Sequence, residues 1–140
     1  MVSNGSLYLR ADTLDNIKSG LIAANVGIAI DARQVDNRAG EISSTSKVAV
    51  NAREQLDNRA GAIKCSTMDL KVDRASLVNR GGEVVGDSCL GATGGAFDNR
   101  DGGSASGKAG VRVEVASLRN DQGGKLLSDG RLDLAANAVG

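Results

Sequence analysis

The chain has 140 residues, 17 basic and 17 acidic side chains, no proline, no histidine, and Tyr8 and Phe97 as its two aromatic residues. This length fits one domain, and the zero net charge argues against a dedicated basic module that binds nucleic acid or acidic membranes. The absence of histidine excludes Ser–His–Asp and Cys–His catalytic sites and histidine-containing zinc sites. Because aromatic rings are so scarce, the core must consist of thin layers of Leu, Ile, Val and Ala.

Short segments of alternating apolar residues recur along the whole chain. The first is Leu7, Leu9 and Ala11, and similar segments occupy residues 28–32, 48–52, 70–72, 90–92, 111–115 and 132–136. A period of two is typical of strands with one apolar face. A second apolar element follows in most copies, at Ile42, Ile63, Val84 and Leu126, and residues 104–105 are a weaker copy. We therefore predict two or three short strands per repeat and an all-β chain.

Asparagine recurs between these segments in steps of 20 or 21 residues, at Asn16, Asn37, Asn58, Asn79, Asn99 and Asn120. A large apolar residue stands two positions before each asparagine. Glycine stands three positions after it in five copies, at Gly40, Gly61, Gly82, Gly102 and Gly123. A constant period of this length indicates a repeat architecture. The leucine-rich repeat is excluded, because the positions three before and two after each asparagine hold no leucine.

The remaining architecture is a parallel β-helix with one repeat per coil. Coils of 20–21 residues would stack in register about 4.7–4.9 Å apart. Residues 1–140 are then a single β-helix segment of roughly six to seven coils, forming a rod about 30 Å long. Each inward row would carry like side chains, which explains why aliphatic residues suffice for the core.

The recurring asparagines and glycines are interpreted as architecture, because a single ligand site would not need six copies. An asparagine at a corner can bond its own backbone and tolerates left-handed conformations. Stacked on its neighbours, its amide can also hydrogen-bond the asparagines above and below. Each glycine is expected to supply a backbone angle that a Cβ would forbid.

An arginine follows four of the asparagines, at Arg38, Arg59, Arg80 and Arg100. One guanidinium group per coil along an edge forms a candidate stripe for an anionic polysaccharide. The alternative is a neutralised, solvated edge, because aspartate stands two residues before three of the arginines, at Asp36, Asp57 and Asp98.

Other chemistry-bearing residues suggest no catalytic, cofactor or metal site. The acids Asp101, Asp121, Asp129 and Asp133 depart from the repeat but form no convincing cluster. The segment GGAFDNRDGG matches neither an EF-hand nor a calcium-binding nonapeptide. Cys65 and Cys89 lack metal-ligand spacing, and their expected offset of roughly 10 Å exceeds disulfide reach. We therefore predict no enzyme, no cofactor, no metal and two free thiols.

No targeting or membrane segment is recognisable. The longest apolar stretch, residues 21–30, is interrupted by Asn25 and is too short to span a bilayer. The first residues, MVSNGSLYLR, lack the basic and apolar regions of a signal peptide.

The corner strings resemble the repeats of filamentous haemagglutinin-like proteins. These strings are VDNRAG, LDNRAG, LVNRGG and FDNRDG, at residues 35–40, 56–61, 77–82 and 97–102. The proteins are large exoproteins of bacterial two-partner secretion, including contact-dependent inhibition proteins, and the resemblance extends from residue 7 to about residue 139. It implies a right-handed β-helix, secretion through an outer-membrane transporter, and a surface adhesin or toxin-presenting stalk. A receptor or glycan on a host or neighbouring cell would be the partner of the full-length protein.

The chain also departs from that family. It has no signal peptide, no proline and hence no NPNG-type secretion motif, and no toxin domain. We therefore expect an internal piece of a longer shaft, acting mechanically at the bacterial surface. The alternatives are a β-helix polysaccharide-degrading enzyme and a truncated, non-functional fragment.

Overall fold

The computed structural model describes residues 1–73 and 76–140, whose regular structure is β-strand. The all-β prediction is therefore confirmed, and the described residues form no helix that could cross a membrane. The strands in chain order are β1 Val2–Ser3, β2 Ser6–Asp15, β3 Leu21–Ala24, β4 Gly27–Asp36, β5 Glu41–Ser44, β6 Lys47–Asp57, β7 Ala62–Val78, β8 Glu83–Asp98, β9 Ser104–Gly107, β10 Gly110–Arg119, β11 Lys125–Leu127 and β12 Arg131–Val139.

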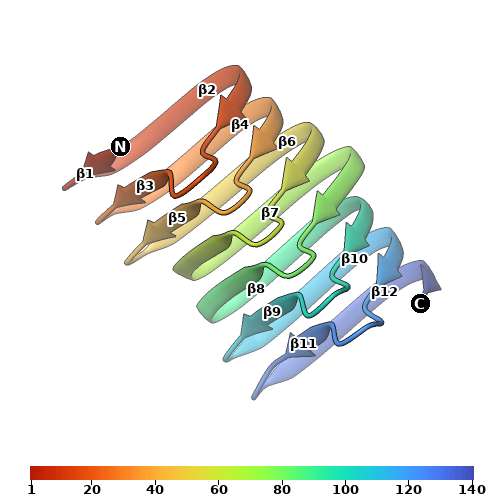
Figure 1. Cartoon of the computed structure of the whole chain (residues 1–140). Helices are drawn as coiled ribbons and strands as arrows, with labels where there is room; N and C mark the ends of the chain where they lie inside the picture. The colour runs from red at the N-terminus through yellow and green to blue at the C-terminus, as the bar shows by residue number, and fades with distance from the viewer.

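The strands wind into a parallel solenoid (Figure 1). The long strands stack as β2, β4, β6, β7, β8, β10 and β12. The short strands β1, β3 and β5 form a second stack. It continues through the first parts of β7 and β8 and ends with β9 and β11. Pairing is in register, so that Ile28 lies between Leu7 one coil before and Val48 one coil after. The prediction of one repeat per coil is confirmed, whereas the right hand of the winding stays a prediction.

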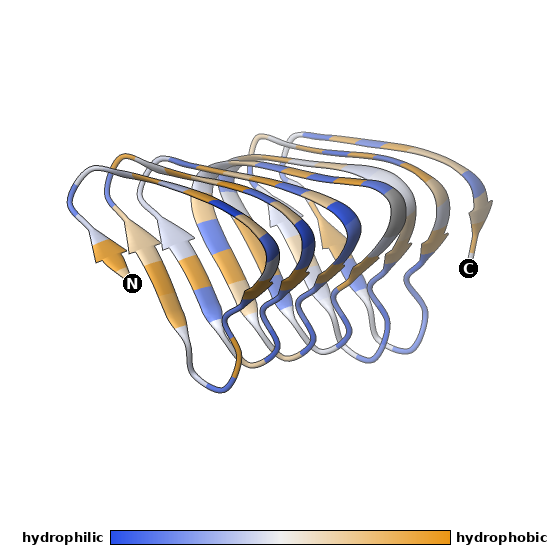
Figure 2. Ribbon diagram, turned by 90° about the horizontal axis from the view of Figure 1, so that it is seen from above, coloured by the Kyte–Doolittle hydropathy of each residue, from blue (hydrophilic) through white to orange (hydrophobic). Residues whose placement is uncertain are grey.

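The interior consists of rows of like side chains, one from each coil. One row contains Val35, Leu56, Leu77, Phe97 and Leu118, and each of these residues is at most 3% exposed. Apolar and polar residues alternate along the long strands, which places one set inside and the other outside (Figure 2). Burying one such aliphatic side chain contributes roughly 1.5–3 kcal/mol. The stack of rows replaces the single thick core of an ordinary domain.

The aromatic ring of Phe97 occupies a row that otherwise holds Leu and Val. Its coil also contains Ala92 and Gly94, which pair with the larger Leu70 and Val72 of the preceding coil. The ring therefore coincides with the coil whose neighbouring inward residues are small. A close-packed interior requires such compensation in volume.

Some core residues were unassigned or only weakly indicated by the sequence pattern, and Met68 and Ala105 are examples. Met68 is 2% exposed and lies in the row of Val48 and Leu90. Ala105 is fully buried beside Val84, within a segment that looked like a weak strand. In both cases the register with the neighbouring coils decides which face of the strand points inward.

Candidate functional site

The six motif asparagines form a continuous ladder along one corner of the solenoid. The Nδ2 of each of the first five donates to the Oδ1 of the asparagine in the next coil. From Asn16 to Asn120 these distances are 2.7, 2.7, 2.7, 2.8 and 2.8 Å. The side chains of Asn37, Asn58, Asn79 and Asn99 are fully buried.

A second hydrogen bond ties each of these five donor amides to the strand that begins after the next asparagine turn. Asn37 Nδ2 donates to the carbonyl oxygen of Ala62 at 3.1 Å, and Asn58 Nδ2 donates to that of Glu83 at 3.1 Å. The backbone N–H of each asparagine is also used, as in the 2.7 Å bond from Asn37 to Asp57. The four inner amides, from Asn37 to Asn99, thus both donate and accept, as a buried polar group requires. Asparagine suits the position because its amide carries both two N–H donors and an acceptor.

Glycines at this corner serve two different structural purposes, a close approach of two backbones and a positive φ. The prediction that glycine supplies an unusual backbone angle is wrong for Gly40, Gly61 and Gly82, because their φ is not positive. A Cβ on these residues would lie 1.8–2.2 Å from the asparagine carbonyl oxygen of the preceding coil. They are needed because two backbones approach closely. Gly20, Gly103 and Gly124, four residues after their asparagines, meet similar obstacles.

The left-handed conformation falls one residue before these close-packed glycines. Gly102 and Gly123 adopt it, with φ of 78° and 82°. In other coils the same turn uses non-glycine residues, including Ala39 and Ala60, both with φ of 54°. The glycine three residues after the asparagine therefore allows the close backbone approach in some coils and adopts the positive φ in others.

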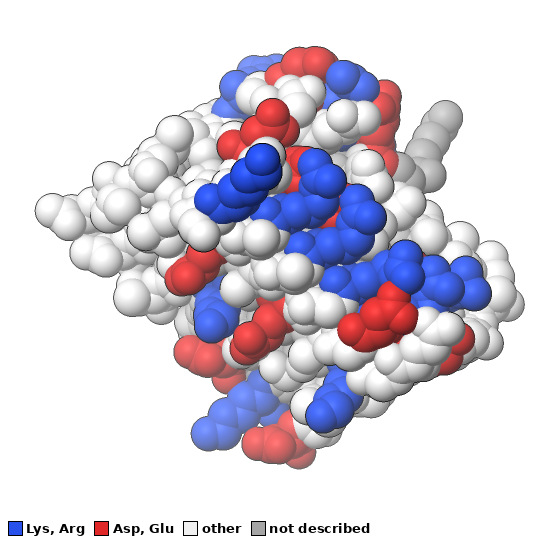
Figure 3. Space-filling view, viewed as in Figure 1, with Lys and Arg blue, Asp and Glu red and all other residues white. Residues whose placement is uncertain are grey.

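Each arginine of the candidate stripe is paired with a carboxylate. The Nη2 atoms of Arg38, Arg59 and Arg100 each lie 2.7 Å from a carboxylate oxygen, and their partners are Asp36, Asp57 and Asp98. Arg80 instead reaches Asp101 of the next coil, with its Nε at 2.7 Å. In the view of Figure 3, basic side chains gather in a band across the solenoid and acidic side chains lie beside it.

Ion pairing changes the acidity of two of these carboxyl groups, Asp36 and Asp98. The Arg38 guanidinium lowers the pKa of Asp36 through its hydrogen bonds, and Arg100 does the same for Asp98. The edge therefore carries alternating, mutually neutralised charges rather than four free cations. Binding of an anionic glycan stays a prediction, and the geometry gives it no added support.

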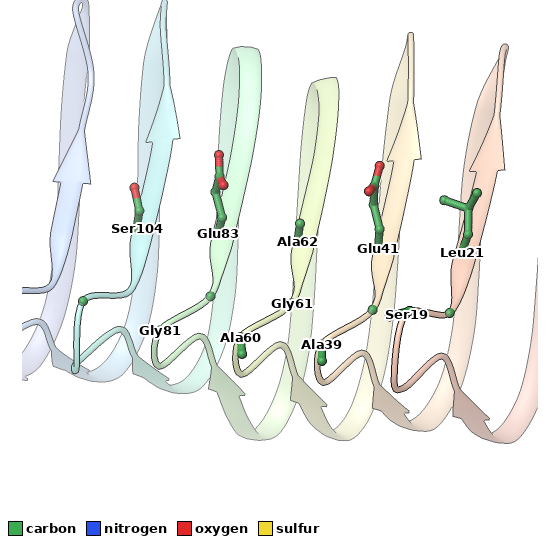
Figure 4. Close-up of a pocket in the computed structure, with 14 residues that line it drawn as sticks. Ser19, Leu21, Ala39, Glu41, Ala60, Gly61, Ala62, Gly81, Glu83 and Ser104 are labelled. Atoms are coloured by element: carbon green, nitrogen blue, oxygen red, sulfur yellow. The ribbon is translucent and has the colours of Figure 1, made fainter.

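A shallow groove follows the turns beside the ladder (Figure 4). Its floor is made of glycine and alanine residues, including Ala39, Ala60 and Gly61. Glu41 and Glu83 point up from the strands that begin beyond the turns, with Ala62 between them in the stack (Figure 4). The groove offers mostly backbone and very small side chains, which provide no acid–base pair.

The other candidate residues are dispersed over the solenoid. Asp101 pairs with Arg80 and Asp133 pairs with Arg131. Within residues 1–73 and 76–140, no three His, Cys, Asp or Glu side chains gather where they could hold a metal ion. Cys65 is buried and Cys89 is exposed, both as free thiols, and burial raises the pKa of Cys65 to about 11.

A family comparison accounts for this regular corner. The model of the haemagglutinin repeat family matches residues 2–60 and 67–137. The chain belongs to the haemagglutinin repeat family. Its two matched stretches hold all six ladder asparagines, so the haemagglutinin repeat and the asparagine ladder coincide. No curated protein and no solved structure matches the chain.

Proposed function

We propose that this haemagglutinin repeat chain is a structural shaft segment of a secreted exoprotein exposed on the bacterial surface. It would act as a stiff spacer that holds a distal adhesive or toxin-bearing part away from the cell. The exoprotein would be of the adhesin or contact-dependent inhibition type and would leave the cell through an outer-membrane transporter. A receptor or glycan would be contacted by the full-length protein. In this proposal the segment itself catalyses no reaction.

The observation that carries this proposal is the repetition of the same contacts in every coil. The amide ladder runs through all six motif copies, and the backbone pairing beside it is parallel and in register. A solenoid of this kind has nearly additive stability, with one interface term per coil. Length can then change by whole coils without altering the remaining contacts, which suits a spacer.

A deletion of one whole period tests the proposal. Removing residues 37–57 joins Asp36 directly to Asn58 and keeps the VDNRAG string intact. The segment would be displayed on a bacterial surface between an anchor and an epitope tag. A spacer should still present the tag, and the purified variant should be shorter by one coil, about 4.8 Å, in small-angle X-ray scattering.

A deletion of residues 37–46 is the matched control, because it removes about half a coil and breaks the register. This control should lose both tag display and cooperative unfolding. The proposal fails if removing the whole period is as damaging as removing half of it. It also fails if the intact chain cleaves polysaccharides and Asp121→Asn or Asp129→Asn abolishes the cleavage.

A further inference from the structure

The chain is rich in asparagine, yet Asn4 is its only asparagine that precedes a glycine. We propose that Asn4 is a site of spontaneous deamidation in the folded protein, and that the fold protects the ladder asparagines from the same reaction. The backbone nitrogen of Gly5 attacks the side-chain carbonyl carbon of Asn4, and the amide nitrogen leaves as ammonia. Water then opens the resulting succinimide to aspartate or isoaspartate.

The surroundings of Asn4 permit this ring closure. Asn4 and Gly5 are exposed and lie in the turn between β1 and β2. Gly5 has no side chain to hinder the approach, and the nearest atom to a Cβ built on it is Ser3 Oγ at 4.0 Å. Glycine also moves its backbone more freely than any other residue. The attacking nitrogen and the amide carbon can therefore meet through local motion of a surface turn.

Hydrogen bonds in the folded protein hinder deamidation of the ladder asparagines. In the buried coils, the amide nitrogen that would leave is itself a hydrogen-bond donor, as Asn58 Nδ2 is to Asn79 Oδ1 and to the carbonyl oxygen of Glu83. The backbone nitrogen that would attack is also occupied in three coils. Arg38 N donates to Asp36 Oδ1 and Arg59 N donates to Asp57 Oδ1, both at 3.1 Å. Arg100 N donates to Asp98 Oδ1 at 3.3 Å. Deamidation there requires the coil to open first, which makes it slower by the cost of opening.

One hydrogen bond restrains the reaction at Asn4. The backbone N–H of Gly5 donates to Ser3 Oγ at 3.1 Å in an exposed turn. Its acceptor is a neutral hydroxyl, whereas Arg38 N and Arg59 N donate to charged carboxylates. It is therefore the weaker kind of bond, so it slows the attack but does not prevent it. Removing the hydroxyl should therefore speed deamidation without touching Asn4 or Gly5.

The modification adds one negative charge at the second corner of the first coil. Isoaspartate also lengthens the backbone between Ser3 and Gly5, whose carbonyl oxygens accept bonds from Asn25 N at 3.1 Å and Val26 N at 3.0 Å. The first coil should loosen at this edge. The asparagine ladder lies at the other corner and should stay intact.

The test is a time course on the folded full chain at mildly alkaline pH, followed by trypsin digestion and mass spectrometry. The tryptic peptide of residues 1–10 contains Asn4 as its only asparagine. We expect it to gain the mass of an amide-to-acid conversion at least about tenfold faster than the peptides that carry the ladder asparagines. Unfolding the chain in urea should narrow that difference.

Two variants check the assignment. Gly5→Ala should slow the conversion, and Gly5 has no positive φ that alanine would strain. Ser3→Ala should accelerate it. The exposed Asn25, which precedes Val26, serves as the internal control. The proposal is overturned if Asn4 stays unmodified in the folded chain, if ladder asparagines convert as fast, or if Gly5→Ala leaves the rate unchanged.

Discussion

Replacing Asn58 by aspartate is the sharpest test of the ladder, because the change alters chemistry with almost no change in shape. Asn58 is fully buried, donates to Asn79 Oδ1 at 2.7 Å and to Glu83 O at 3.1 Å, and accepts from Asn37 Nδ2 at 2.7 Å. A carboxylate keeps the acceptor but loses both donors. The buried Asn79 Oδ1 and the partly buried carbonyl oxygen of Glu83 then lose this donor, which costs about 1–3 kcal/mol each.

The expected loss at neutral pH is therefore about 2–6 kcal/mol, a large part of the 5–15 kcal/mol typical of a whole domain. Burial and the facing oxygens disfavour the charged form, so the pKa of the introduced carboxyl group rises on folding. The folded state then binds more protons than the unfolded state. Stability must fall as pH rises from the unfolded pKa through the folded pKa.

Urea unfolding followed by circular dichroism, at several pH values from 4 to 8, measures both effects for Asn58→Asp. Asn25→Asp is the matched control, because Asn25 is exposed and lies outside the ladder. It should change stability by less than about 0.5 kcal/mol. If Asn58→Asp costs under about 1 kcal/mol at pH 7, or becomes more stable with rising pH, the ladder does not stabilise the solenoid as argued.

Three further changes probe the corner and the core. Leu77→Ala should cost about 2–5 kcal/mol in urea unfolding, because Leu77 is only 3% exposed; a neutral effect would place it outside the packed row. Gly61→Ala should unfold much of the chain, since its Cβ would lie 2.2 Å from a carbonyl oxygen. Ala60→Gly should raise stability by up to about 1 kcal/mol by relieving a φ of 54°, and equal melting temperatures for these two variants would refute the assignment of roles. Arg100→Gln should lower stability at pH 7, because it removes the ion pair in which Arg100 Nη2 lies 2.7 Å from an Asp98 oxygen. Arg100 lowers the pKa of Asp98 in the folded state. The stabilisation by the pair is therefore present above the pKa that Asp98 has in the unfolded state, and it is lost as pH falls through the pKa of the folded state. An unchanged acid-unfolding profile in the variant would count against the pair.

Much of the fold could be predicted because each coil of a solenoid repeats the same sequence pattern. The 20–21 residue period, the alternation of apolar residues and the recurrent asparagine all depend on positions within one coil. The same local pattern also predicted the stacking of Leu56, Leu77 and Phe97, which the structure places in one buried row. Where the pattern weakened, at Met68 and Ala105, only the neighbouring coils showed that the residue is inside.

The roles of the corner residues could not be predicted with the same ease. Gly61 is required by the carbonyl oxygen of Asn37, a residue 24 positions earlier (61 − 37). Arg80 takes its carboxylate from the next coil, whereas Arg59 takes one from its own. Such partners depend on the exact register between coils and on the length of each turn. The close-packed glycine follows the asparagine by three residues in some coils and by four in others.

The sequence by itself determined a zero-charge, histidine-free, nearly ring-free chain built from one repeated unit, and thereby the solenoid class. Where the alternation is clear, it also determined which residues form the rows, because alternation within a strand decides the buried face. Only the tertiary structure decided how the polar corner is satisfied. Amides, carboxylates and glycines there meet partners a full coil away, and their geometry exists only once the coils are stacked.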